Sequence, residues 1–149
     1  MTKILFVCHG NICRSPMAEF VMKDLVKKAG LEGDFEIASA ATSREELGNP
    51  VYPPARKLLL AHGIDPAGKR AMQMTRADYG YYDYLVGMEA YNLRNMERIC
   101  GGDPEGRLYR LLDFTDHPRD IGDPWYSGDF EGTWQDVLEG CRALLERLT

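Results

Sequence analysis

The sequence predicts an α/β fold, a single domain in which helices cover both faces of a four-stranded parallel sheet. Three observations carry this prediction. The chain has 149 residues, which suits one well-packed domain. Short apolar segments alternate with helical patterns, the order that parallel βαβ units produce. The first apolar segment is continuous, as in a strand covered on both faces. No linker or repeat interrupts the chain, so residues 1–149 are interpreted as one domain.

Four segments are predicted to be strands, with helical patterns between them. The strands are expected at 3–8, 35–40, 84–88 and 108–112. A helix is expected at 17–29, where Gly30 ends the pattern. Further helices are expected at 49–62 after a proline-rich entry, at 75–78 with a threonine cap, at 89–99 and at 133–148. The Asp-, Pro- and Gly-rich stretch before the last helix is expected to be irregular.

Charge and composition exclude several classes of protein. The net charge of −5 and the lack of a long basic run argue against nucleic-acid binding. No apolar stretch approaches the roughly 20 residues of a membrane helix, and the start of the chain is too brief for a secretory signal. Four cysteines and three scattered histidines lack metal-ligand spacing, so we expect no metal and no cofactor. We expect a monomer in the reducing cytoplasm.

An eight-residue segment after the first predicted strand has the composition of an anion-binding loop: Cys8-His9-Gly10-Asn11-Ile12-Cys13-Arg14-Ser15. It joins a strand to a helix, where backbone N–H groups can converge and the helix N-terminus adds partial positive charge. The Arg14 guanidinium can hold two phosphate oxygens at once. The same positive field would favour the thiolate form of Cys8. The segment therefore predicts a phosphate site with its own nucleophile.

Neighbouring residue types agree with a tight functional loop. Gly10 and Asn11 tolerate left-handed backbone. Ser15 offers a hydroxyl at the expected helix cap, and Pro16 suits the first helical turn. A cysteine and an arginine at this spacing carry little weight alone. It is the agreement of several local signals that favours a functional loop over a structural one.

A carboxylic acid is needed to complete such a site. A thiolate that attacks a phosphate monoester expels an alkoxide or phenoxide, which leaves poorly unless it is protonated. Five aspartates follow the fourth predicted strand, and we choose Asp123 because it begins Asp123-Pro124-Trp125-Tyr126. The proline stiffens the backbone, and two aromatic side chains stand ready to flank a flat leaving group. On the residues alone, the neighbouring aspartates compete with Asp123 for this role.

The segment from Cys8 to Glu19, together with Asp123-Pro124-Trp125-Tyr126, resembles the low-molecular-weight protein tyrosine phosphatases over essentially the whole chain. The resemblance implies a flavodoxin-like sheet of four parallel strands. It also implies hydrolysis of phosphotyrosine in proteins or of small aryl phosphates, with inorganic phosphate as the product. Cys8 would be the nucleophile, Arg14 would bind the phosphoryl oxygens, and Asp123 would be the general acid and later the base for water.

The resemblance also implies supporting roles around the loop. Ser15 would hydrogen-bond the thiolate. Asn11 would hold the strained shape of the loop, and Ser39 would steady Asn11. The family often has a glycine where Ala41 stands and a histidine near Gly68 that helps to anchor the loop asparagine.

A rim of three side chains is expected at the mouth of the site. By the resemblance these are Glu45, Trp125 and Tyr126, and the family often has an aromatic residue near Glu45. A carboxylate there would disfavour acidic peptides. His9 occupies a variable loop position, and its positive character could favour the thiolate, although a solvated side chain is the favoured interpretation.

The remaining cysteines have more than one interpretation. Cys13 either packs as a small apolar residue or forms a disulfide with oxidised Cys8, and we favour the disulfide because both thiols share one tight loop. Cys100 and Cys141 lie in helical patterns and are expected to fill the core.

Two other functions stay open at this point. Arsenate reduction on the same scaffold would need further thiols near the loop, and Cys100 and Cys141 have no local partner. A phosphate-sensing module or a phosphocysteine carrier would need a long-lived intermediate and no acid poised to admit water. Asp123 and its aromatic neighbours argue against the carrier, so phosphotyrosine hydrolysis is favoured.

Overall fold

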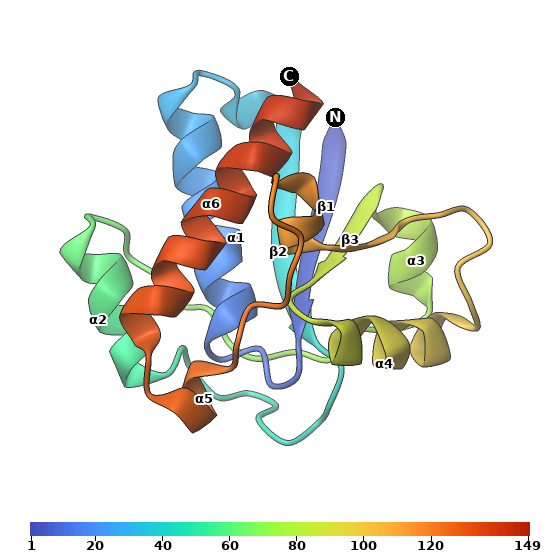
Figure 1. Cartoon of the computed structure of the whole chain (residues 1–149), viewed down its shortest axis with the longest axis horizontal. Helices are drawn as coiled ribbons and strands as arrows, with labels where there is room; N and C mark the ends of the chain where they lie inside the picture. The colour runs from blue at the N-terminus through green and yellow to red at the C-terminus, as the bar shows by residue number, and fades with distance from the viewer.

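Four parallel strands form the centre of the molecule in the computed structural model, which describes residues 1–149 (Figure 1). Their order across the sheet is β2-β1-β3-β4. The strands are β1 (Thr2–Cys8), β2 (Phe35–Ala41), β3 (Tyr84–Gly87) and β4 (Leu108–Arg110). β1 pairs with both β2 and β3, so the strand that ends at Cys8 lies in the interior of the sheet. The carboxyl ends of all four strands meet at one edge, where ligands of such sheets bind.

Helices cover both faces of the sheet. On one face pack α1 (Arg14–Lys28), α2 (Pro53–Ala61) and α6 (Phe130–Leu148); on the other pack α3 (Ala77–Tyr81) and α4 (Ala90–Cys100). The short elements are η1 (Glu32–Asp34), η2 (Leu111–Phe114) and α5 (Pro124–Ser127). None of these helices combines the length and the hydropathy that a bilayer crossing requires.

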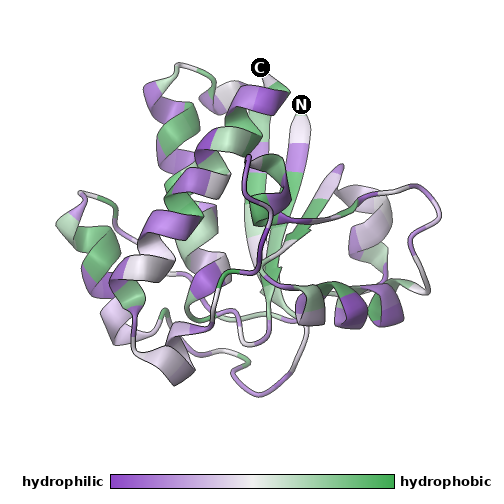
Figure 2. Cartoon of the chain, in the orientation of Figure 1, coloured by the Kyte–Doolittle hydropathy of each residue, from purple (hydrophilic) through white to green (hydrophobic).

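The side chains of β1 alternate between two hydrophobic clusters. Ile4 and Phe6 pack with α1 and α6 in the larger cluster, and Leu5 and Val7 pack with Met96 of α4 in the smaller one. All four strand residues are at most 3% exposed. Burying each such side chain contributes about 1.5–3 kcal/mol. In Figure 2 the strands are largely hydrophobic toward their carboxyl ends, and the surrounding helices carry both hydrophilic and hydrophobic residues. The unbroken apolar run in the sequence is thus explained by burial on both faces, and the predicted fold class is confirmed.

Several element boundaries differ from the sequence prediction. α1 begins at Arg14 and not at residue 17, so Ser15 lies inside the helix and Cys13 is the N-cap residue. The short helix expected at 75–78 lies at Ala77–Tyr81, and no side chain caps it. The strand expected at 108–112 stops at Arg110, where η2 takes over. The ends of helices and strands are the positions that hydrophobic periodicity defines least well.

Gly140 of α6 lies directly against Leu111 of η2. A Cβ atom on Gly140 would stand 2.5 Å from Leu111 Cγ, well inside van der Waals contact. We therefore predict that Gly140→Ala destabilises the protein by about 1–3 kcal/mol, although alanine favours a helix by about 1 kcal/mol over glycine. Denaturant unfolding measures the effect. Gly80→Ala in α3 is the control because nothing lies within 4 Å of its added Cβ; equal stability changes in the two variants would contradict the prediction.

Candidate active site

The loop from β1 to α1 lies at the carboxyl edge of the sheet. Cys8 is the last residue of β1, and Arg14 is the first of α1. Asn11 has a φ of 59°, the one positive φ outside glycine in the chain. This left-handed turn brings the Asn11 N–H to 3.4 Å from the Cys8 sulfur. The N-terminus of α1 adds its partial positive charge to the same space.

Backbone donors in this loop lack acceptors within the protein. The Asn11 N–H points at sulfur, whereas no protein atom accepts from the N–H groups of Gly10, Ile12, Cys13, Arg14 and Ser15. Buried N–H groups in folded proteins are nearly always paired. Several unpaired donors beside one thiol form a nest suited to an oxyanion with several acceptor oxygens.

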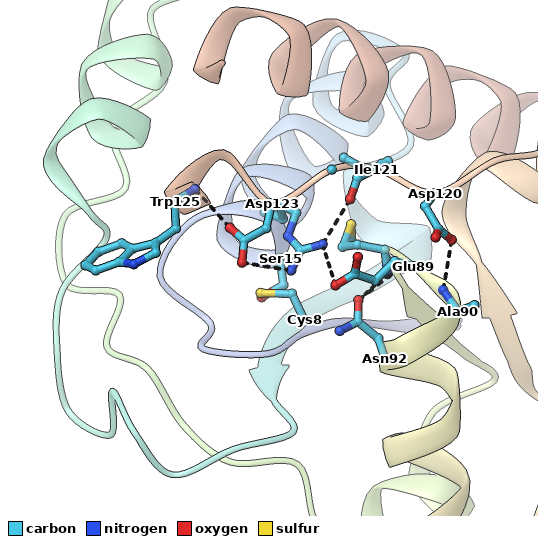
Figure 3. Close-up of polar contacts among 12 residues, drawn as sticks. Cys8, Ser15, Glu89, Ala90, Asn92, Asp120, Ile121, Asp123 and Trp125 are labelled. Atoms are coloured by element: carbon cyan, nitrogen blue, oxygen red, sulfur yellow. Dashed lines mark hydrogen bonds and ion pairs between the residues drawn. The ribbon is translucent and has the colours of Figure 1, made fainter. Parts of the chain in front are cut away.

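Arg14 is buried despite its charge, at 2% exposure. Its Nη1 donates to the Ile121 carbonyl at 2.9 Å and lies 3.2 Å from Glu89 Oε1 (Figure 3). Its Nη2 lies 3.4 Å from Asp123 Oδ2. A buried guanidinium needs such partners because an unpaired buried charge is strongly destabilising. The two carboxylates and the carbonyl fix the position of the guanidinium, and its remaining N–H groups can meet an oxyanion.

A chain of hydrogen bonds supports the loop from within. Cys8 Sγ and Ser15 Oγ are 3.0 Å apart. Asn11 Nδ2 donates to Ser15 Oγ at 2.8 Å and to Ser39 Oγ at 2.9 Å. The Met72 N–H donates to Asn11 Oδ1 at 3.2 Å. The structure therefore brings Asn11, Ser15 and Ser39 together around the thiol, and the Ser15 hydroxyl serves this network and not the helix cap.

Three charged residues that the sequence analysis did not single out continue this network beneath the loop. Ser39 Oγ donates to Glu19 Oε1 at 2.6 Å. Lys69 Nζ donates to the Ser39 carbonyl at 2.8 Å and lies 3.6 Å from Glu19 Oε1, while Lys23 Nζ binds Glu19 Oε2. Burial lowers the pKa of Lys69, and Glu19 partly offsets that shift. One sequence signal could have pointed to Lys69. The family often has a histidine near Gly68 to anchor the loop asparagine, and in this chain Lys69 stands next to Gly68.

Asp123 faces the loop across a pocket of about 130 Å³. Its Oδ1 accepts the Trp125 N–H at 3.0 Å, so Asp123 caps α5 inside the stretch expected to be irregular. The Ile121 N–H donates to the Met88 carbonyl at 2.9 Å, which ties the Asp123 loop to the end of β3. The pocket is lined by Cys8, His9, Gly10, Ile12, Cys13, Arg14, Glu45, Glu46, Asp123, Trp125 and Tyr126.

The competing aspartates lie outside this pocket. Asp113 and Asp120 both pair with Arg110, at 2.8 and 2.9 Å. Asp129 caps α6 by accepting the Gly132 N–H at 2.8 Å. Asp116 is exposed. Of the five aspartates, only Asp123 comes together with Cys8 and Arg14.

The expected rim side chains surround the mouth of the pocket, but His9 differs from the expectation of a solvated residue. His9 is half-buried, and its Nε2 lies 3.0 Å from Glu45 Oε2. The Trp125 ring packs on Tyr52 at 4.8 Å between centroids and points away from Cys8 (Figure 3). Tyr126 is 86% exposed. The contact with Glu45 could not be predicted because it joins two separate loops.

Cys13 lines the pocket beside Cys8, and neither cysteine forms a disulfide in this structure. Burial raises the pKa of Cys13 to about 12, with smaller contributions from Cys8 and Asp123. Cys141 lies in the larger hydrophobic cluster and Cys100 in the smaller one, as expected for core residues. No group of three or more potential metal ligands is close enough to hold an ion.

A thiol beneath unpaired N–H groups and a buried guanidinium, with a carboxyl group across a small pocket, defines the class of enzyme that cleaves phosphate monoesters through sulfur. The family model for low molecular weight phosphotyrosine protein phosphatase matches residues 3–149. The chain therefore belongs to the low molecular weight phosphotyrosine protein phosphatase family, which are hydrolases. The resemblance seen in the sequence is confirmed.

Individual relatives agree with this assignment. The low molecular weight protein-tyrosine-phosphatase YfkJ of Bacillus subtilis is 38% identical over 147 residues, 97% of this chain and 94% of the relative. The human low molecular weight phosphotyrosine protein phosphatase is 38% identical over 149 residues, with the same shares of 97% and 94%. The crystal structure of YfkJ superposes with a TM-score of 0.96 at 37% identity, covering 99% of this chain and 94% of that one.

We predict that Lys69→Met lowers kcat on an aryl phosphate about tenfold, a loss of roughly 1.4 kcal/mol, and changes KM by less than about twofold. The reason is that Lys69 holds Ser39 and so the loop, without reaching the phosphate site. Lys69→Arg keeps the cation and should restore most of the activity. Steady-state kinetics alongside thermal unfolding make the measurement. Lys57→Met, on the exposed side of α2, is the control; an unchanged kcat in folded Lys69→Met would refute the role.

Proposed function

We propose that this protein hydrolyses phosphotyrosine in proteins and in small aryl phosphates, through a phosphocysteine on Cys8. The observation that carries this proposal is the meeting of Cys8, Arg14 and Asp123 around one pocket beneath unpaired loop donors. Nucleophile, oxyanion ligands and acid are all within one small cavity, which is the arrangement that covalent phosphoryl transfer requires.

In the first step, the Cys8 sulfur attacks phosphorus and the bond from phosphorus to the phenolic oxygen breaks. The loop N–H groups and Arg14 stabilise the charge that develops on the phosphoryl oxygens, and they need no reorganisation because they are already in place. Asp123 gives its proton to the leaving phenolate. Ser15 Oγ, 3.0 Å from the sulfur, stabilises its negative charge before attack.

In the second step, water cleaves the phosphocysteine. The Asp123 carboxylate, now unprotonated, removes a proton from water, and the water oxygen attacks phosphorus. The bond between sulfur and phosphorus breaks, inorganic phosphate is released and the Cys8 thiolate returns. Both steps use the same ligands because the two transition states have similar charge.

The shape of the pocket supports an aromatic leaving group. Its volume is about 130 Å³, and Trp125 and Tyr126 line its mouth. Aromatic side chains at the mouth favour a flat substrate group. The names of the curated relatives, phosphotyrosine and protein-tyrosine phosphatases, point to the same substrate class.

The alternative functions receive less support from the site. Arsenate reduction would need further thiols near Cys8, and Cys100 and Cys141 are buried in separate hydrophobic clusters. A phosphocysteine carrier would exclude a group that activates water, whereas Asp123 lines the pocket. We place the enzyme in the cytoplasm, where reducing conditions protect a reactive thiol. We propose that it is a monomer. A net charge of −5 disfavours nucleic-acid partners.

The proposed function predicts different results for two substitutions. Cys8→Ser should abolish turnover of p-nitrophenyl phosphate while the protein still binds vanadate. Asp123→Asn should lower kcat by about 10²–10⁴ on phenyl phosphate and by less on p-nitrophenyl phosphate, whose leaving group needs less help from an acid. Steady-state kinetics and vanadate titration make the measurements, with exposed Asp116→Asn as the control. Full turnover by Cys8→Ser would end the proposal.

Cys13 is proposed to protect oxidised Cys8. A Cys8 sulfenic acid would react with the Cys13 thiol to form a disulfide and release water. A thiol reductant would then reduce this disulfide and restore both thiols. Because the pKa of Cys13 is raised to about 12, the attacking thiolate becomes more abundant as pH rises through the neutral and alkaline range. We predict that after peroxide and then dithiothreitol the parent regains most activity and Cys13→Ala regains little. Equal recovery by both proteins would disprove this role.

A further inference from the structure

A groove of about 470 Å³ opens beside the catalytic pocket, and the proposed mechanism does not use it. Groove and pocket share three lining residues, Ile12, Glu46 and Trp125. The two hollows are therefore continuous at the mouth. A chain segment attached to a phosphotyrosine in the pocket can reach the groove directly across this shared edge.

The bed of the groove is apolar. Val51 and Pro66 are buried, and Pro50, Pro53 and the Tyr52 ring complete it. The Tyr52 ring packs on the Trp125 ring, which forms the wall toward the pocket. Such a surface suits an extended peptide backbone, which places alternate side chains against it.

Two arginines border this bed without a partner. Arg56 lies near the start of α2, and Arg70 lies in the segment that pairs with Pro50. Both are exposed, and neither forms an ion pair or a side-chain hydrogen bond within the protein, although acidic residues outnumber basic ones in the chain by 23 to 18. The one acidic residue in the groove, Glu46, accepts a hydrogen bond from Asn49 Nδ2 at 2.6 Å. The groove is therefore basic within an acidic protein.

The charge at the mouth differs from one edge to the other. A second hollow of about 620 Å³ shares His9, Asp123 and Tyr126 with the pocket or its rim and is otherwise lined by Glu89, Tyr91 and Ser127. It contains no lysine or arginine. Of the two hollows beside the pocket, only the groove is thus lined by arginine or lysine.

We propose that the groove binds the residues that flank phosphotyrosine on one side, and that Arg56 and Arg70 select substrates with aspartate or glutamate there. The inference rests on the proposed function. A carboxylate accepts charge-assisted hydrogen bonds from a guanidinium fork in either arginine. The Glu45 carboxylate, expected to repel acidic peptides, does not line the groove and is held by His9 at 3.0 Å.

The test compares phosphotyrosine peptides in an alanine background with matched peptides that carry two glutamates before or after the phosphotyrosine. For the parent, we expect glutamates on one side to raise kcat/KM about tenfold and glutamates on the other side to raise it less. Added salt should shrink the difference because the arginines are exposed. In the double variant Arg56→Gln/Arg70→Gln, the preference should fall to about one while p-nitrophenyl phosphate turnover is unchanged.

The control is the double variant Lys57→Gln/Arg142→Gln, which loses the same charge at exposed positions outside the groove. It should keep the preference of the parent. The proposal is overturned if the parent shows no preference, if the preference survives loss of Arg56 and Arg70, or if the control loses it equally. Fluorescence anisotropy of the same peptides with Cys8→Ser measures their affinity for the groove in the absence of turnover. If the parent protein did not hydrolyse p-nitrophenyl phosphate, the proposed function would be rejected independently of the peptide results.

Discussion

The pairing of one buried guanidinium determines how this site is assembled. Arg14 is 2% exposed and contacts Glu89, Asp123 and the Ile121 carbonyl. These partners come from the start of α4 and from the loop before α5, far from Arg14 in the sequence. Because an uncompensated buried charge is strongly destabilising, folding must bring the three segments together. The contacts that stabilise the folded protein also place the acid opposite the nucleophile.

Beneath the loop, a second set of buried charges serves the backbone. The left-handed Asn11 is held by Ser15 and Ser39, and Ser39 is held in turn by Glu19 and Lys69. A partly satisfied polar network inside a core is costly, and this one is connected without a break from the Cys8 sulfur to Lys69 and Lys23. The strain of an unusual φ is thereby balanced by hydrogen bonds. The shape of the loop is thus specified by hydrogen bonds within the protein.

The sequence predicted the fold class and the chemistry of the loop, because both depend on local patterns. The apolar run of β1 and the motif from Cys8 to Ser15 are each unbroken in the sequence, so both can be interpreted without a structure. The helix that Asp123 caps was missed because one turn is too short to show periodicity. Glu19, Lys69 and the pair of His9 with Glu45 were missed or misjudged since each contact joins distant segments. Burial and ion pairing across segments are set by tertiary packing, which composition and spacing do not reveal.

The cap of α5 has a consequence for the orientation of the Asp123 carboxyl group. Asp123 Oδ1 accepts the Trp125 amide hydrogen, while Oδ2 is the oxygen turned toward Arg14. Each oxygen therefore faces a different N–H donor, so turning the carboxyl group would exchange the amide contact for the guanidinium contact. One turn of helix thus makes two chemically equivalent oxygens unequal. These two contacts fix the plane of the carboxyl group relative to the loop that holds Cys8.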